Sequence, residues 1–306
     1  MMPQSQNQDL VQYFENIIKN HQEFSYFINN PNEYKKITKI ATTQFSNYLF
    51  EQFEQKNVIY IRHAESPINV WVSKNPIKFM LSMYPPDPQL YNPGITEKGM
   101  DQCVQLEKLL NKAKKYELIE QKSDEQQQQQ QFEVENMNLP SSFSLVVLSP
   151  YQRTIKTFDQ IRQSEVFKTA KIITSSLIRE RANIPASVVG YMTSQLKQNR
   201  NDIDYQYLNK EKWWKLYDQQ DENFQNHQTE SIKRESNIEL QFRVLIFLIW
   251  ITLREEKDII FFSHCAVYEA IKLFKVKKPN NAQPYRITKQ DFFNLYRQFF
   301  KTNPSL

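Results

Sequence analysis

Apolar side chains recur at helical intervals near the N-terminus. From Gln8 to about Gln55 they are spaced three and four residues apart, as one buried face of a helix requires. The side chains in this pattern are Leu10, Tyr13, Phe14, Ile17, Ile18, Phe45, Tyr48, Leu49 and Phe53. The pattern predicts a helical N-terminal extension over residues 1–55.

The pattern changes at Asn57, where short runs of β-branched and aromatic residues predict buried strands. The four runs are VIYI after Asn57, SLVVLS at Ser144–Ser149, KIITSS at Lys171–Ser176 and DIIFFS at Asp258–Ser263. Stretches with helical periodicity lie between them. Strands that alternate with helices favour an α/β layer fold.

Two later segments have the periodicity of helices. Apolar positions in Leu240–Leu253 predict a helix that packs on one face, and Thr288–Phe300 suits a docked amphipathic helix. We assign residues 291–306 to a C-terminal helix and tail. Two other segments are polar: 120–138, which contains six consecutive glutamines, is expected to be a disordered insertion, and 185–234 a lid-like insertion.

Composition excludes several classes of protein. Three glycines in 306 residues leave no G-x-G-x-x-G turn and no phosphate-binding loop of the G-x-x-x-x-G-K-[ST] type. Two cysteines make neither a zinc ribbon nor a disulfide framework, and they favour a reducing compartment. The longest apolar run, Val244–Leu253, is about half of a membrane span, and the N-terminus lacks the apolar stretch of a signal peptide. We therefore expect a cytoplasmic protein with no membrane partner.

The net charge of +5 is small, and the lysines and arginines are spread along the chain. This distribution is not typical of a nucleic-acid-binding protein, but it is compatible with an anionic substrate.

Candidate chemistry lies where the predicted strands end. His63 and His264 each follow a strand, and the carboxyl ends of parallel strands meet at one edge of a sheet. Arg62 adjoins His63, Arg153 falls in the first turn of a helix capped by Ser149, and Glu180 follows a further strand. Two guanidinium groups and a helix start form a site for an anion such as phosphate. The positions of the two histidines alone fit a polar residue at the edge of the core as well as they fit a site residue.

Several short motifs occur in one order along the chain. They are Arg62-His63-Ala64-Glu65-Ser66 with Asn69, Ile95-Thr96-Glu97-Lys98-Gly99 with Gln102, Ser149-Pro150-Tyr151-Gln152-Arg153-Thr154, Leu177-Ile178-Arg179-Glu180, Glu235-Ser236 with Arg243, and Ser263-His264. In this order the chain resembles the histidine phosphatase superfamily, in its phosphoglycerate-mutase-like branch. We expect residues 56–290 to form a histidine phosphatase-like domain, folded as a three-layer α/β/α sandwich with a mostly parallel central sheet.

The resemblance implies a role for each motif residue. His63 would be the nucleophile, and Arg62, Arg153 and His264 would hold the phosphoryl oxygens, joined by the neutral groups of Asn69 and Thr154. Glu180 would be the proton donor. The implied activity is that of a phosphatase of the histidine acid type, which acts on a small phosphorylated substrate through a phosphohistidine, without a metal or another cofactor.

Two residues depart from the family pattern, because Ala64 and Cys265 stand where glycine is usual. If either position needed a positive φ, the Cβ would cost about 1 kcal/mol or more and would lower activity.

Three functions stay open at this point. They are a phosphatase, a mutase that returns the phosphoryl group to its substrate, and a non-catalytic phospholigand-binding protein with a protein partner on the N-terminal extension.

Overall fold

A computed structural model describes residues 43–77, 88–117, 139–182, 190–208 and 235–300, with five isolated residues nearer the N-terminus. The glutamine-rich segment 120–138 lies outside the described residues. So do most of residues 1–42, the tail 301–306 and the larger part of the lid-like segment 185–234.

The centre of the fold is a five-stranded sheet with the order β3-β2-β4-β1-β5. Its first four strands are parallel to their neighbours, and β5 pairs with β1 in the antiparallel direction. The strands are β1 (Asn57–Arg62), β2 (Leu145–Leu148), β3 (Lys171–Thr174), β4 (Asp258–Ser263) and β5 (Pro284–Arg286). The four strands predicted from sequence are therefore confirmed, and β5 is an additional edge strand.

Helices lie between the strands in the chain. The α-helices are α4 (Thr43–Glu54), α5 (Pro67–Lys74), α7 (Glu97–Glu117), α9 (Gln152–Ile161), α10 (Thr193–Asn199), α11 (Asn237–Leu253), α12 (Cys265–Ile271) and α13 (Lys289–Phe299). Short 3₁₀ turns are η1 (Pro88–Leu90), η2 (Glu165–Phe167) and η3 (Ser176–Ile178). The tail helix expected at Thr288–Phe300 is confirmed by α13.

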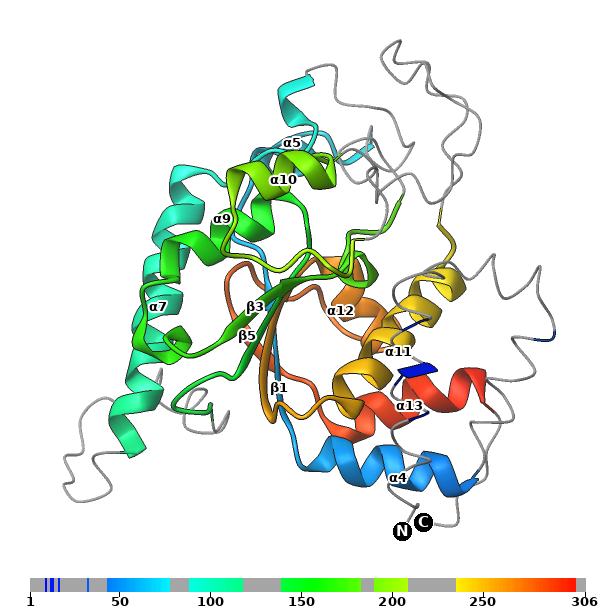
Figure 1. Ribbon diagram of the computed structural model, residues 1–306. Coiled ribbons are helices and arrows are strands. Elements are labelled where there is room, and N and C mark those ends of the chain that lie inside the picture. The colour runs from blue at the N-terminus through cyan, green and yellow to red at the C-terminus, as the bar shows by residue number, and fades with distance from the viewer. Residues whose placement is uncertain are drawn as a thin grey trace.

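Helices cover both faces of the sheet, as Figure 1 shows. Successive strand side chains point to opposite faces. Val58 and Tyr60 of β1 therefore join the core under α4, α11, α12 and α13. Ile59 and Ile61 join a second core under α7 and α9. These two cores on either side of one sheet confirm the three-layer α/β/α sandwich.

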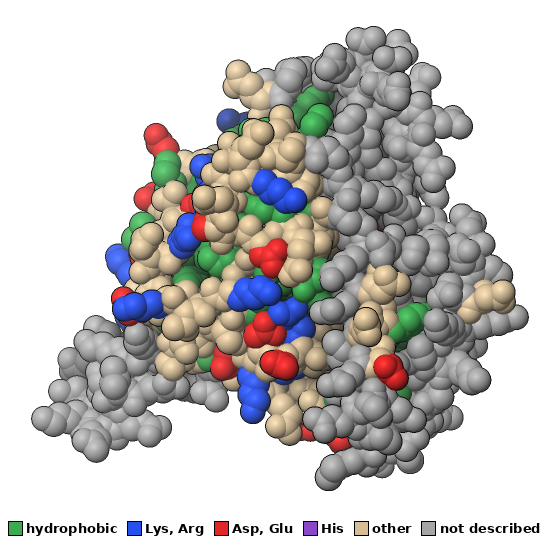
Figure 2. Space-filling model, viewed as in Figure 1, with side chains coloured by type: hydrophobic (Ala, Val, Ile, Leu, Met, Phe, Trp, Pro, Cys, Tyr) green, Lys and Arg blue, Asp and Glu red, His purple; other side chains and the backbone are tan. Residues whose placement is uncertain are grey.

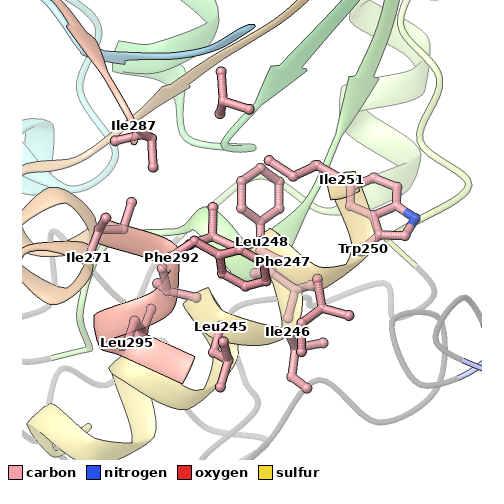
Figure 3. Close-up of a cluster of buried hydrophobic side chains, with 14 of the residues drawn as sticks. Leu245, Ile246, Phe247, Leu248, Trp250, Ile251, Ile271, Ile287, Phe292 and Leu295 are labelled. Carbon is pink, nitrogen blue, oxygen red and sulfur yellow. The ribbon is translucent and has the colours of Figure 1, made fainter. Parts of the chain in front are cut away.

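Helix α11 lies inside the larger core rather than on its surface. Its side chains from Glu239 to Thr252 are all buried. Figure 3 shows Phe247 and Leu248 of α11 in a cluster with Phe292 of α13 and Ile287. The predicted packing of this helix is confirmed for Leu240, Val244, Phe247, Leu248 and Ile251, which are all fully buried. The expectation that it is amphipathic is wrong, because α4 and α13 also pack against it and leave no water-facing side between Glu239 and Thr252.

The surface agrees with the dispersed charge of the sequence. Figure 2 shows basic and acidic side chains interspersed on one face of the molecule. Within the part of the chain that the structure describes, no helix combines the length and the apolar composition that a membrane span requires.

Candidate active site

The two strand-end histidines lie side by side. Strands β1 and β4 are neighbours whose last residues, Arg62 and Ser263, are paired in register. His63 and His264 follow directly, and their ring centroids are 5.2 Å apart. Both side chains are buried, with exposed fractions of 2% and 0%. The strand-end rule therefore brings together two residues that are distant in the chain.

A backbone carbonyl determines the tautomer of His63. Its Nδ1 lies 2.7 Å from the carbonyl oxygen of Ala64, which can only accept a hydrogen bond. Nδ1 therefore carries the proton and Nε2 carries the lone pair. Burial lowers the pKa of His63 well below its usual value, and the charges of Arg153 and Arg62 lower it further. The imidazole is consequently neutral at pH 7.

The peptide that holds His63 is itself fixed from three sides. The His63 amide donates to the Ser263 carbonyl at 3.0 Å. The Ala64 amide donates to Oγ1 of Thr157 at 2.9 Å, and Nδ2 of Asn281 donates to the His63 carbonyl at 2.6 Å. Groups from β4, α9 and the loop before β5 thus immobilise the histidine backbone.

Two arginines and a glutamate face the same space. Arg153, in the first turn of α9, is 2% exposed, and its Nη2 lies 4.0 Å from Oε2 of Glu180. Arg62 ends β1 and donates through Nη1 to the Pro279 carbonyl at 2.8 Å. The Glu180 side chain is 20% exposed, so water reaches it. Charged groups from the ends of β1, β2 and β3 therefore surround the histidine pair.

His264 is oriented by a serine. Its Nε2 lies 2.7 Å from Oγ of Ser149, and its Nδ1 lies 3.7 Å from Oε2 of Glu180. That carboxylate would favour a charged imidazole. Burial and the positive charge of Arg153 outweigh it, and they hold the pKa of His264 well below its usual value. We therefore assign a neutral ring to His264.

Two of the expected phosphate ligands have other hydrogen bonds in the structure. The Thr154 hydroxyl lies 2.6 Å from each of the Ser149 and Tyr151 carbonyls, so its single proton is already donated to the backbone. Oδ1 of Asn69 accepts hydrogen bonds from the amide and hydroxyl of Ser66 at the start of α5. Both side chains stabilise local backbone, because nearby backbone groups compete for short polar side chains.

The helix after β2 also begins later than expected. Tyr151, not Ser149, is the N-cap residue of α9. The predicted cap by Ser149 is wrong, because its hydroxyl is bonded to His264 instead.

The two departures at glycine positions introduce no backbone strain. Neither Ala64 nor Cys265 has a positive φ. The expected cost of a Cβ at these positions therefore does not arise. Burial raises the pKa of the Cys265 thiol to about 12, so it is protonated at pH 7.

The histidine pair and Glu180 also offer metal-ligating atoms within 4.8 Å of one another. The positive charges of Arg153 and Arg62 both lower the pKa of His63. Both arginines therefore act on the space that the histidines and Glu180 share. An anion fits these charges better than a cation does.

Sequence reasoning missed the residues that orient the two histidines. Ser149, Thr157 and Asn281 contact the histidines or their backbone, and none of them was assigned such a role. Thr157 lies four residues after Arg153 on α9, so helical spacing alone places both on one face. No comparable pattern in the sequence indicated the contact from Asn281.

Comparisons with known proteins supplement this geometry. No family model matches the chain, and no curated protein matches it. One similar solved structure is titled a "putative alpha-ribazole-5'-P phosphatase" from Escherichia coli. It has 14% identity and a TM-score of 0.39, over 75% of this chain and 88% of that one. Another is the ecdysone phosphate phosphatase from Bombix mori in complex with tungstate. It has 14% identity and a TM-score of 0.42, over 75% of this chain and 87% of that one. The functional assignment of this chain therefore depends on its own site residues.

Proposed function

We propose that this chain is a phosphomonoesterase that forms a phosphohistidine on His63. The observation that carries the proposal is the hydrogen bond from Nδ1 of His63 to the Ala64 carbonyl. It leaves Nε2 as a neutral nucleophile within a cluster of positive charge. Covalent catalysis of this kind divides one difficult displacement into two easier ones.

Unpaired donors in the site support phosphate as its ligand. Nε of Arg62 is a buried donor with no hydrogen-bond partner in the structure, and Nδ1 of His264, which is also buried and unpaired, is a donor when Nε2 accepts from Oγ of Ser149. Buried polar groups without partners cost free energy, so they favour a ligand rich in acceptors. A phosphate monoester supplies several acceptor oxygens and nearly two negative charges. Arg153 adds a third group that stabilises charge in the transition state.

Glu180 is the proton donor in this proposal. Nε2 of His63 attacks phosphorus while the ester P–O bond breaks, and the carboxyl of Glu180 gives its proton to the leaving oxygen. The resulting carboxylate then takes a proton from water as that water attacks the phosphohistidine. Inorganic phosphate leaves and His63 is regenerated. The exposed fraction of the Glu180 side chain favours hydrolysis over a mutase reaction, which must exclude water.

The test is phosphate release from an aryl phosphate in EDTA, by the wild type and by His63→Ala. We expect turnover by the wild type and a loss of at least about 10³-fold in the variant. His227→Ala is the matched control, because its sequence surroundings are polar and it belongs to no motif. Acid-labile label on the wild type after a radiolabelled substrate pulse would report the phosphohistidine.

Other outcomes point to other functions. Turnover that is unaffected by His63→Ala would refute the mechanism. Isomerisation of a phosphorylated sugar acid without phosphate release would indicate a mutase. Phosphate-dependent thermal stabilisation with no turnover would indicate a binding protein.

A further inference from the structure

A second cluster of charged residues lies fully buried beside the proposed acid. Glu235, just before α11, is 0% exposed, and Arg179 and Arg243 are each 1% exposed. Oε1 of Glu235 accepts from Nε of Arg243 at 2.5 Å, and Oε2 accepts from Nη2 of Arg243 at 2.8 Å. Nη2 of Arg179 lies 3.4 Å from Oε1. None of these residues belongs to the phosphate site described above.

This cluster holds the backbone on both sides of Glu180. Arg243 donates through Nη1 to the Leu177 carbonyl at 2.5 Å and through Nη2 to the Glu180 carbonyl at 3.3 Å. On the other side, the Ala182 amide donates to Oε2 of Glu235 at 3.2 Å, and the Glu235 amide donates to the Ala182 carbonyl at 2.8 Å. Residues 177–182 are thereby fixed at both ends.

The Glu180 carboxylate itself has few contacts that would fix it. Its Oε1 accepts a hydrogen bond from the amide of the next residue, Arg181, at 3.0 Å. Arg153 and His264 lie 4.0 and 3.7 Å away, which is beyond hydrogen-bond distance. The position of the carboxylate therefore depends on the backbone that carries it.

The charge state of the cluster is stable over the working pH range. Burial alone would raise the pKa of Glu235, but the charges of Arg243 and Arg179 outweigh it and lower the pKa to about 2. The carboxylate therefore stays ionised and bidentate with Arg243, a geometry that lysine cannot reproduce.

We propose that Glu235 and Arg243 are positioning residues that hold segment 177–182 so that Glu180 reaches the leaving oxygen. This proposal rests on the proposed function and deepens it. It assigns a role in proton donation to two residues that do not touch the substrate.

The test uses the chemistry of the leaving group. An alkyl phosphate needs a proton on its leaving oxygen, whereas 2,4-dinitrophenyl phosphate does not, because its phenolate is a good leaving group. The ratio kcat/KM includes only the steps up to phosphoryl transfer. Both substrates are measured with Glu235→Gln, Arg243→Lys and, as reference, Glu180→Gln. The matched controls are Glu256→Gln and Arg254→Lys, an ion pair at the other end of α11 whose closest N–O distance is 2.5 Å.

We expect both cluster variants to lower kcat/KM for the alkyl ester about tenfold to a hundredfold. For the dinitrophenyl ester we expect a change of less than about threefold, and the inhibition constant of inorganic phosphate should stay the same. Glu180→Gln should show the same selectivity for the alkyl ester. Adding Glu235→Gln to it should cause little further loss, because both act on one step. The control variants should leave both substrates unaffected.

Equal losses for both esters would overturn the proposal, since the cluster would then support the whole site. Unchanged kinetics in folded variants would also overturn it. If Glu235→Gln does not fold, Arg243→Lys decides, since it keeps the charge and loses the bidentate geometry. A wild type without His63-dependent turnover would refute the proposed function itself. That result is distinct from normal turnover without leaving-group selectivity in the variants.

Discussion

Replacing Gly99 by alanine tests whether α7 and the His63 loop are packed as closely as the structure indicates. Gly99 lies in the first turn of α7, and a Cβ there would be 2.4 Å from the Glu65 carbonyl oxygen and 3.1 Å from Cβ of Ile95. Ordinary contacts begin at 3.4 Å, so the Glu65 carbonyl or the helix must move by about 1 Å. The obstructing atom belongs to the backbone, which cannot turn away as a side chain would.

The backbone of Glu65 also joins the loop after His63 to α7. Its carbonyl accepts a hydrogen bond from the Thr96 amide at 2.9 Å, and its amide donates to Oε1 of Gln102 at 2.8 Å. Overpacking costs about 1–3 kcal/mol, and better helix propensity returns up to about 1 kcal/mol. We expect Gly99→Ala to lower the free energy of unfolding by about 1–2 kcal/mol. At about 2–4 °C per kcal/mol, the melting temperature should fall by about 2–8 °C.

Activity should fall as well, because Glu65 is two residues from His63. A displacement near 1 Å can cost up to about a hundredfold in rate, so we expect kcat/KM to fall at least about tenfold. Gly94→Ala is the matched control, since its Cβ would meet only Cγ of Lys156, at 3.8 Å. It should be neutral or slightly stabilising. Thermal melts and aryl phosphate hydrolysis check both variants. Equal behaviour of the two alanine variants would refute the close packing of Gly99 on Glu65.

Three further predictions concern the site and the core. The pKa of His63 is lowered by burial and by the two arginines, so its proton is lost well below pH 6.5. After correction for substrate ionisation, kcat/KM should not decline as pH falls from 7 to 6.5. A decline centred at pH 6.5 or above would contradict the lowered pKa of His63. Phe247→Ala should cost about 3–5 kcal/mol in urea unfolding, because Phe247 is fully buried with its ring 5.1 Å from that of Phe261. Ile238→Ala, at an exposed position of the same helix, should cost less than about 0.5 kcal/mol. The pKa of Cys265 is raised to about 12, so peroxide at pH 7 should leave activity intact, and rapid inactivation would show a reactive thiolate.

The main strands were predictable because their sequences carry a local signal. Four runs of β-branched and aromatic residues match β1–β4, which are buried by helices on both faces. The strand β5 has three residues and begins with Pro284, so it shows no alternation that a pattern could reveal. The burial of α11 on all sides was not predictable, since it depends on α4 and α13, which are distant in the chain.

The site was predictable to the extent that strand ends determine it. The rule that parallel strands end at one edge placed His63, His264, Arg153 and Glu180 together. It could not assign hydrogen bonds, because a hydroxyl such as that of Thr154 has several possible acceptors and the nearest backbone carbonyls take its proton. The strand-end rule also could not predict the ion cluster of Glu235, for a different reason. Its partner segment lies more than 50 residues earlier in the chain, and only the folded core brings them together.

The hydrogen bonds around His63 also explain why a residue other than glycine is acceptable beside it. The tautomer of His63 with its proton on Nδ1 needs the Ala64 carbonyl, which is backbone and independent of the side chain. That peptide is held through the Ala64 amide by Thr157 and through the His63 carbonyl by Asn281. The Ala64 side chain is fully buried in the core under α7 and α9. Because φ at Ala64 is not positive, the methyl group adds buried apolar contact without distorting the peptide. The orientation of His63 therefore depends on Thr157 and Asn281 more than on the residue type at position 64.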